Sequence, residues 1–246
     1  MGNAMKQAFV AAILSVGLPL AAHAQSGEIF IPGADNGAEV QVKPKPQSAL
    51  ARCLANPNAA NCADVGGDDG GLAFESAGAI EYETLVLDLD EKKVTVSKAP
   101  PPAPPSYDAP QTPAHGTVAY PSVAITIEFD YDSDQIRGDQ ITKIMNLVNA
   151  LNDPALQGTT YAVIGHTDSV GSFGYNCDLS LRRAASVTRT LEGANVYVPL
   201  YPVGFGEHVL KDTHNPRSAV NRRVTFMRLP DNPGAVLQTA NAVCRS

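Results

Sequence analysis

The hydrophobic pattern of residues 117–229 alternates between the periods of strands and helices, and predicts an α/β (α+β) domain. Residues 123–129 place apolar side chains at every second position, as in a strand with one buried face. Residues 161–164 read Tyr-Ala-Val-Ile, a continuous apolar run that suits a strand buried on both faces. Two more strands are predicted over residues 198–205 and 224–227, and prolines in the first favour an edge position or an irregular segment.

Two segments between these strands repeat apolar residues with the period of a helix. The first is expected to begin with Asp139 as a cap and to end at Asp153-Pro154. The second is expected over residues 175–192 and to stop at Gly193. The apolar faces are Ile141, Ile144, Met145, Val148 and Leu151 in the first helix, and Ala184, Val187, Thr188 and Leu191 in the second. The resulting order, βαβαββ, implies a mixed sheet with helices packed on it.

The preceding part of the chain has weaker patterns and predicts a largely irregular region. Residues 25–71 are rich in Gly, Asn, Pro and Asp, which favours an extended or loosely folded segment. Residues 80–97 alternate apolar and polar positions on both sides of a turn at Glu91-Lys92, and predict a β-hairpin. Because a lone hairpin is only marginally stable, we expect it to pair with another element.

Residues 98–116 contain the run Ala-Pro-Pro-Pro-Ala-Pro-Pro and predict a Pro-rich linker in the polyproline II conformation. Such a linker could reach about 60 Å. It separates an acidic, Gly- and Asn-rich N-terminal region, residues 25–97, from the domain at 117–229. Residues 230–246 are left as a C-terminal tail.

Residues 1–24 predict a cleaved secretory signal peptide. Lys6 precedes an apolar run from Ala8 to Leu20, and Ala22-His23-Ala24 supplies the small residues of a cleavage site. The run is shorter than the roughly 20 apolar residues that a membrane-spanning helix needs. No Cys stands at the cleavage site to accept a bacterial lipid anchor.

Net charge excludes a general nucleic-acid binder. The chain carries a formal charge of −7 at pH 7. Most of it lies in residues 1–116, where seven Lys and Arg face thirteen Asp and Glu. Neither half has the basic excess that binding to a phosphate backbone requires.

Four cysteines in an exported chain predict disulfides. Cys53 and Cys62 flank a short segment and are expected to pair locally, which leaves Cys177 to pair with Cys244. Four cysteines allow three connectivities, so this pairing is a preference. No CxxC or HxxxH spacing accompanies them, and we predict no metal site.

The candidate chemistry lies just after the strand at 161–164. Gly165-His166-Thr167-Asp168 places a carboxylate on the following loop, and Arg183 places a guanidinium on the next helix. A matched acid and base suit a zwitterionic ligand, and no nucleophile or general base is evidently paired with them. This favours recognition over catalysis. An internal salt bridge between Asp168 and Arg183 is the simpler alternative.

The ordered motifs around these residues resemble the OmpA-like peptidoglycan-binding domain family. The resemblance covers about residues 117–229. It rests on Phe129-Asp130 with Ser133, Gly165-His166-Thr167-Asp168, Gly171, Asn176, Leu179-Ser180, Arg183-Ala184, Gly204-Phe205-Gly206-Glu207 and Asn221-Arg222-Arg223-Val224. It implies a domain that binds the diaminopimelate residue of the peptidoglycan stem peptide without catalysis.

The resemblance also implies roles for single residues. Asp168 would take the ligand ammonium and Arg183 its carboxylate. Arg222 would reach the same carboxylate, and Thr167 is included in the site. Asn176 would pin the loop or touch the ligand backbone. His166 is expected to bond the loop and Arg223 to serve structure, and neither a cofactor nor a catalytic residue is expected.

The sequence therefore predicts a periplasmic, outer-membrane-associated anchor that binds peptidoglycan. Its N-terminal region would contact an outer-membrane or envelope protein across the linker. Two alternatives stay open. One is a periplasmic cell-wall hydrolase that uses Asp168 or His166. The other is an adhesin or secretion component whose main activity lies in residues 25–98.

Overall fold

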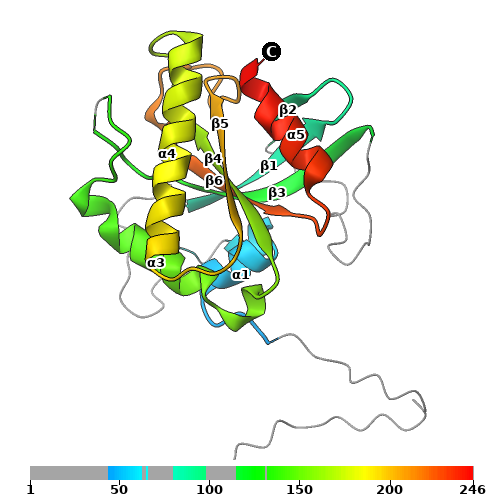
Figure 1. Ribbon diagram of the computed structural model, residues 1–246, viewed down its shortest axis with the longest axis vertical. Coiled ribbons are helices and arrows are strands. Elements are labelled where there is room, and N and C mark those ends of the chain that lie inside the picture. The colour runs from blue at the N-terminus through cyan, green and yellow to red at the C-terminus, as the bar shows by residue number, and fades with distance from the viewer. Residues whose placement is uncertain (1–43, 63–64, 66–79, 98–114, 131, 246) are drawn as a thin grey trace, which may run out of the picture. The chain divides into compact units, whose positions relative to one another are not determined.

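A six-stranded mixed sheet, in the order β2-β1-β3-β6-β4-β5, forms the centre of the fold (Figure 1). The computed structural model describes residues 44–62, 65, 80–97, 115–130 and 132–245. The strands are β1 Ile80–Asp88, β2 Lys93–Ser97, β3 Thr117–Ile125, β4 Thr160–His166, β5 Leu200–Gly206 and β6 Val224–Leu229. Only β4 and β5 are parallel among the strand pairs of the described residues. The predicted mixed sheet is confirmed, with β5 at its edge.

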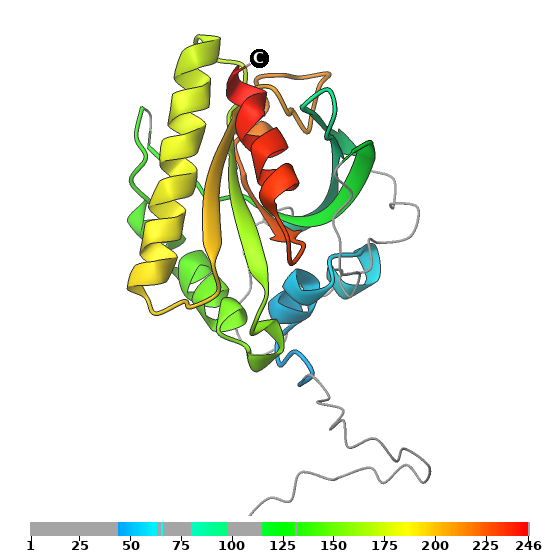
Figure 2. The same ribbon diagram turned by 45° about the vertical axis from the view of Figure 1, so that its right-hand side comes forward.

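Helices cover both faces of the sheet. They are α1 Ala49–Ala55, α2 Ala59–Cys62, α3 Ile141–Leu151, α4 Phe173–Gly193 and α5 Gly234–Ala242. One apolar cluster joins the sheet to α1, α3 and α4, and a second joins its other face to α5. In both ribbon views β5 lies between α4 and α5 (Figures 1 and 2). Consecutive residues of β4 alternate between the two clusters, so the expected strand buried on both faces is confirmed.

The predicted hairpin at 80–97 is confirmed, and it pairs with the sheet. Strand β1 pairs with β3 from Ile80 opposite Ile125 to Asp88 opposite Thr117. This ladder extends β3 toward its N-terminus, so the strand covers 117–125 and not the expected 123–129. Ile127 is buried beyond the strand, and Phe129 forms an isolated bridge with Ile136.

The segment that was expected to hold two modules apart joins two strands of one sheet. Ser97 and Pro121 both pair with Thr84, which places the end of β2 about 16 Å from the start of β3 at Thr117. That span is far shorter than the reach expected for a linker of this length. Residues 98–114 themselves lie outside the described residues. The hairpin and the domain at 117–229 therefore belong to one folded body.

Residues 44–62 are folded, contrary to the expected loose segment. Ser48 caps α1 by accepting a bond from the Ala51 backbone nitrogen at 3.0 Å. Leu50 and Leu54 share the buried face of this helix, and the Tyr161 hydroxyl donates to the Leu54 carbonyl at 3.0 Å. The low-complexity composition around α1 conceals this short apolar face. Residues 1–43 and 66–79 lie outside the described residues, and with them the predicted signal peptide.

The tail at 230–246 contains α5, which buries Val236 and Ala240 against the second cluster. Both predicted disulfides, Cys53 to Cys62 and Cys177 to Cys244, are present. The second one ties the end of the chain to the first turns of α4.

The expected faces of the two central helices are confirmed only in part. Ala184, Val187, Thr188 and Leu191 of α4 are all buried. In α3, however, Ile141 is 49% exposed and Met145 is 47% exposed, while Leu147 and Ala150 are buried. Asp139 does not cap α3. It lies in a 3₁₀ turn, where its carboxylate bonds Arg137.

A buried ion pair ties the hairpin to the last strand. Glu83 of β1 accepts from Arg223 at 3.0 Å and from the Thr225 hydroxyl at 2.5 Å. The side chains of Glu83 and Arg223 are 2% and 1% exposed. Removing one partner would leave the other charge buried and uncompensated, which is costly in a medium of low polarity.

We predict that Glu83→Gln lowers the free energy of unfolding by about 3–5 kcal/mol. Urea denaturation followed by circular dichroism measures this. Glu91→Gln is the matched control, because Glu91 also bonds a cation, Lys93, but on the exposed surface, and no measurable change is expected there. Equal stability of the two variants would contradict the structural role of Glu83.

Candidate functional site

A cationic cavity of about 190 Å³ lies where the end of β4, α4, the segment after β3 and the residues just before β6 meet. Its wall includes more guanidinium groups than carboxylates, which suits an anionic group on a ligand. The charged and aromatic residues of the wall are Glu128, Phe129, Arg137, His166, Arg183, Arg222 and Arg223. Arg223 is neutralised by Glu83, so Arg183 and Arg222 decide what this cavity attracts.

Arg183 enters the cavity from α4, one residue before the core-facing Ala184. Its Nε donates to the Ser133 carbonyl at 3.1 Å, and its Nη2 donates to the Asp130 carbonyl at 3.5 Å. Its Cζ lies 4.9 Å from the ring centre of Phe129. No carboxylate of the described residues forms an ion pair with it. Arg183 is 8% exposed, and this burial is the main cause that lowers its pKa.

Two glycines bring α4 close enough to the sheet for this arrangement. A Cβ at Gly165 would stand 2.1 Å from the Ser180 carbonyl oxygen of α4. A Cβ at Gly204 would stand 2.7 Å from the Ser180 hydroxyl. Both distances are shorter than real Cβ contacts, so any larger residue would push α4 and Arg183 away from the loop that carries Asp168.

Asp168 lies on the loop after β4, and its carboxylate is already paired. Its Oδ2 accepts from Arg222 Nη1 at 2.7 Å, and its Oδ1 accepts from the Val170 backbone nitrogen at 3.0 Å. Its side chain is 12% exposed, whereas that of Arg222 is 48% exposed. The salt bridge between Asp168 and Arg183, which was the simpler alternative to ligand binding, is therefore absent, and Asp168 pairs with Arg222 instead.

Asn176 fixes the loop that carries Asp168. Its Nδ2 donates to the Asp168 carbonyl at 3.3 Å and to Glu207 Oε2 at 2.7 Å. Asn176 is 1% exposed, so it holds the loop from the protein interior. Of its two predicted roles, fixing the loop agrees with this position better than touching the ligand backbone. Its partner Glu207 was not recognised as a site residue from sequence, although it belongs to one of the quoted motifs.

Thr167 is less accessible than the sequence suggested. Its backbone nitrogen donates to the Gly206 carbonyl at 2.9 Å, and its hydroxyl is buried without a partner among the described residues. His166 is also buried, and its Nε2 contacts the Thr225 hydroxyl at 3.1 Å. Burial, followed by the charge of Arg223, holds the pKa of His166 well below its usual range, so the ring is neutral at pH 7.

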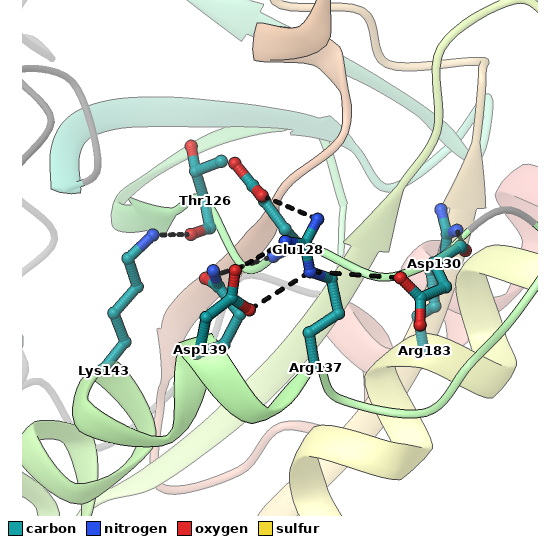
Figure 3. A network of polar contacts seen from close by, with 8 residues as sticks. Thr126, Glu128, Asp130, Arg137, Asp139, Lys143 and Arg183 are labelled. Carbon is teal, nitrogen blue, oxygen red and sulfur yellow. Dashed lines mark hydrogen bonds and ion pairs between the residues drawn. The ribbon is translucent and has the colours of Figure 1, made fainter.

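An ion cluster centred on Arg137 orders the segment that holds Arg183 (Figure 3). Arg137 bonds Asp139 through two nitrogens, at 2.5 and 3.1 Å. Its Nη1 lies 3.3 Å from Glu128 Oε2, and its Nε lies 4.0 Å from Asp130 Oδ1. The cluster joins both ends of the 128–139 segment, whose carbonyls accept from Arg183. Sequence did not reveal it, because charged residues two to nine positions apart outside a helix have no fixed geometry.

The described residues contain no group of three or more His, Cys, Asp or Glu side chains arranged to hold a metal ion. None of the helices in the described part of the chain is long and apolar enough to cross a membrane.

Residues 128–223 match the model of the OmpA family. The chain is 36% identical over 132 residues to outer membrane porin F of Pseudomonas aeruginosa, covering 47% of this chain and 36% of the porin. It is 35% identical over 106 residues to outer membrane porin F of Pseudomonas fluorescens, covering 42% and 32%. The chain thus spans about a third of the length of these curated relatives.

Two solved structures match part of the chain. The peptidoglycan-associated lipoprotein of Burkholderia pseudomallei is 24% identical, with a TM-score of 0.36, over 42% of this chain and 87% of that one. The OmpA-like domain of FopA1 from Francisella tularensis is 19% identical, with a TM-score of 0.36, over 45% and 73%.

We predict that Arg137→Ala loosens the 128–139 segment without unfolding the domain. Amide hydrogen exchange of this segment should become faster, because its two ends lose their common cation, while exchange in β4 and β6 stays unchanged. Arg189→Ala, on the exposed side of α4, is the control and should leave the segment protected. Unchanged exchange in Arg137→Ala would show that the cluster does not order the segment.

Proposed function

Residues 128–223 are an OmpA family domain, and on that premise we propose that the chain binds peptidoglycan through the diaminopimelate residue of the stem peptide. The free end of that residue carries an ammonium and a carboxylate on one carbon. Asp168 takes the ammonium, and Arg183 takes the carboxylate. The protein holds the cell wall reversibly and performs no chemical step on it.

The observation that carries this proposal is the state of Arg183. Its guanidinium is largely buried, held only by carbonyl oxygens and an aromatic ring, and faces a cavity shared with Arg222. A buried cation without a carboxylate partner is unfavourable unless an anion binds to it. A ligand carboxylate can form two parallel bonds with a guanidinium, which makes it the anion of best fit.

The expected strength suits a reversible anchor. A hydrogen bond to a charged group contributes about 1.5–3 kcal/mol. Two or three such bonds, reduced by the entropy cost of association, give an affinity weak enough to release the wall. Many copies on one sacculus would still hold firmly, because linked sites act at high effective concentration.

We further propose that the protein works in the periplasm in association with the outer membrane. Its similarity to outer membrane porin F of two Pseudomonas species supports this location. An envelope protein would be contacted by the acidic N-terminal region. Strands β1 and β2 of that region belong to the same sheet as β4, whose end lines the cavity. A contact made by these two strands would therefore arise on the body that binds the wall, and not at the far end of a long spacer.

A hydrolase function has less support from the site. His166 is buried and neutral with its Nε2 against Thr225, and the Asp168 carboxylate is paired with Arg222. Neither group is arranged to activate water or to attack a peptide carbonyl. We therefore expect binding without release of soluble wall fragments.

Co-sedimentation with isolated sacculi tests the proposal. The protein should pellet with diaminopimelate-containing sacculi, and no muropeptides should appear in the supernatant. Asp168→Ala and Arg183→Ala should each weaken binding by about 10-fold or more, since each removes at least one charge-assisted bond. Arg189→Ala serves as the control for Arg183→Ala, because it loses the same positive charge on the exposed side of α4.

Circular dichroism and a thermal melt of each variant exclude unfolding as the cause of lost binding. Full binding by both folded variants would refute the assigned site. Release of muropeptides that Asp168→Ala abolishes would support the hydrolase instead.

A further inference from the structure

The ion pair between Asp168 and Arg222 occupies the carboxylate that the proposed function reserves for the ligand ammonium. Arg222 Nη1 lies 2.7 Å from Asp168 Oδ2, and the half-exposed Arg222 can leave this position more easily than the buried Asp168. A ligand amine therefore competes with a cation that is already in place. Its binding depends on where the displaced guanidinium can go.

A displaced Arg222 would remain beside the cavity, whose wall it shares with Arg183. Besides burial, the positive charge of Arg222 lowers the pKa of Arg183, so the two guanidiniums already repel each other. Glu128 is the carboxylate on the cavity wall, but it lies 3.3 Å from Arg137 and is committed to that cluster. An amine without a carboxylate would thus leave the displaced Arg222 unpaired near Arg183, at an electrostatic cost.

A carboxylate on the same carbon as the amine removes this cost. It enters the cavity between Arg183 and Arg222 and pairs with both, while the ammonium replaces Arg222 at Asp168. The exchange breaks one ion pair and forms at least two. The net charge of the site does not change, because the ligand brings one charge of each sign.

Building on the proposed function, we propose that Arg222 makes recognition conditional on an ionised carboxylate beside the ammonium. The site then accepts stem peptides whose diaminopimelate side-chain carboxyl is free. It rejects those in which this carboxyl is a carboxamide, and those with lysine at the same position. A carboxamide is neutral and presents N–H donors to guanidinium N–H donors, so it can neutralise neither arginine.

Isothermal titration of the full chain with three tripeptides tests this inference. The peptides are L-Ala-γ-D-Glu-meso-diaminopimelate, the same peptide with its side-chain carboxyl amidated, and the same peptide with lysine as the third residue. The first should bind about 10-fold or more tightly than the other two, because they lack the anion for two guanidiniums.

Arg222→Gln gives the sharper result, since it should move two affinities in opposite directions. Diaminopimelate peptide should bind more weakly, because one guanidinium is lost. Lysine peptide should bind more tightly than it does to the unaltered protein, because Asp168 is unoccupied and no cation is displaced. A merely structural role for Arg222 would weaken both. Arg217→Gln, on the exposed surface of the loop before Arg222, is the control and should change neither.

Equal affinity for the acid and the amide, or a fall in lysine peptide affinity in Arg222→Gln, would overturn the inference and leave peptidoglycan binding in place. Failure of all three peptides to bind, together with failure to pellet with sacculi, would overturn the proposed function as well. The two failures are therefore distinguishable.

Discussion

The organising constraint of this site is a guanidinium that is almost buried and that no carboxylate of the described chain neutralises. Carbonyl oxygens of Asp130 and Ser133 and the face of Phe129 stabilise Arg183 only in part, because they are neutral. The acid of the motif, Asp168, is held by Arg222 instead. The unpaired guanidinium of Arg183 thus lies beside an exchangeable ion pair, Asp168 with Arg222. A zwitterion can pair with both, since it carries one charge of each sign.

The fold is arranged to keep that cation in place. Gly165 and Gly204 let α4 lie against β4 and β5, and the disulfide at Cys177 ties the start of α4 to the 3₁₀ turn that follows α5. Asn176, next to that cysteine, fixes the Asp168 loop. On the other side, Glu83 from the hairpin neutralises the second arginine of the cavity wall, Arg223. The N-terminal hairpin is in this way part of the same folded body as the cavity.

Helices and strands whose hydrophobic pattern reflects their own burial could be predicted from the sequence. Strand ends and side-chain contacts that depend on residues elsewhere in the chain could not. The alternating faces of β4 and the buried face of α4 are local patterns, and both were predicted. The extent of β3 depends on its pairing with β1, some forty residues away. The predicted bounds of this strand were therefore wrong by several residues at each end. Asp139 looked like a helix cap by local rules, but Arg137 attracts it more strongly.

The same limit applies to the site. The sequence predicted Asp168, Arg183, Asn176 and Arg222 as site residues, because an ordered set of motifs marks them. It did not reveal that Asp168 pairs with Arg222 and not with Arg183, since both arginines carry the same charge and the choice depends on how the loops pack. The Arg137 cluster was missed for the same reason.

The central claim concerns the carboxylate and the ammonium on one ligand carbon. The carboxylate pairs with Arg183 and the ammonium displaces Arg222 from Asp168 in a single event. Side-chain NMR of the ¹⁵N-labelled guanidinium groups, recorded while a diaminopimelate tripeptide is added, tests it most directly. The account predicts that the Arg183 and Arg222 signals shift together with one dissociation constant, while the Arg223 signal stays in place. Binding that leaves the Arg183 signal unchanged, or that moves Arg183 while Arg222 keeps its unbound shift, would contradict the account.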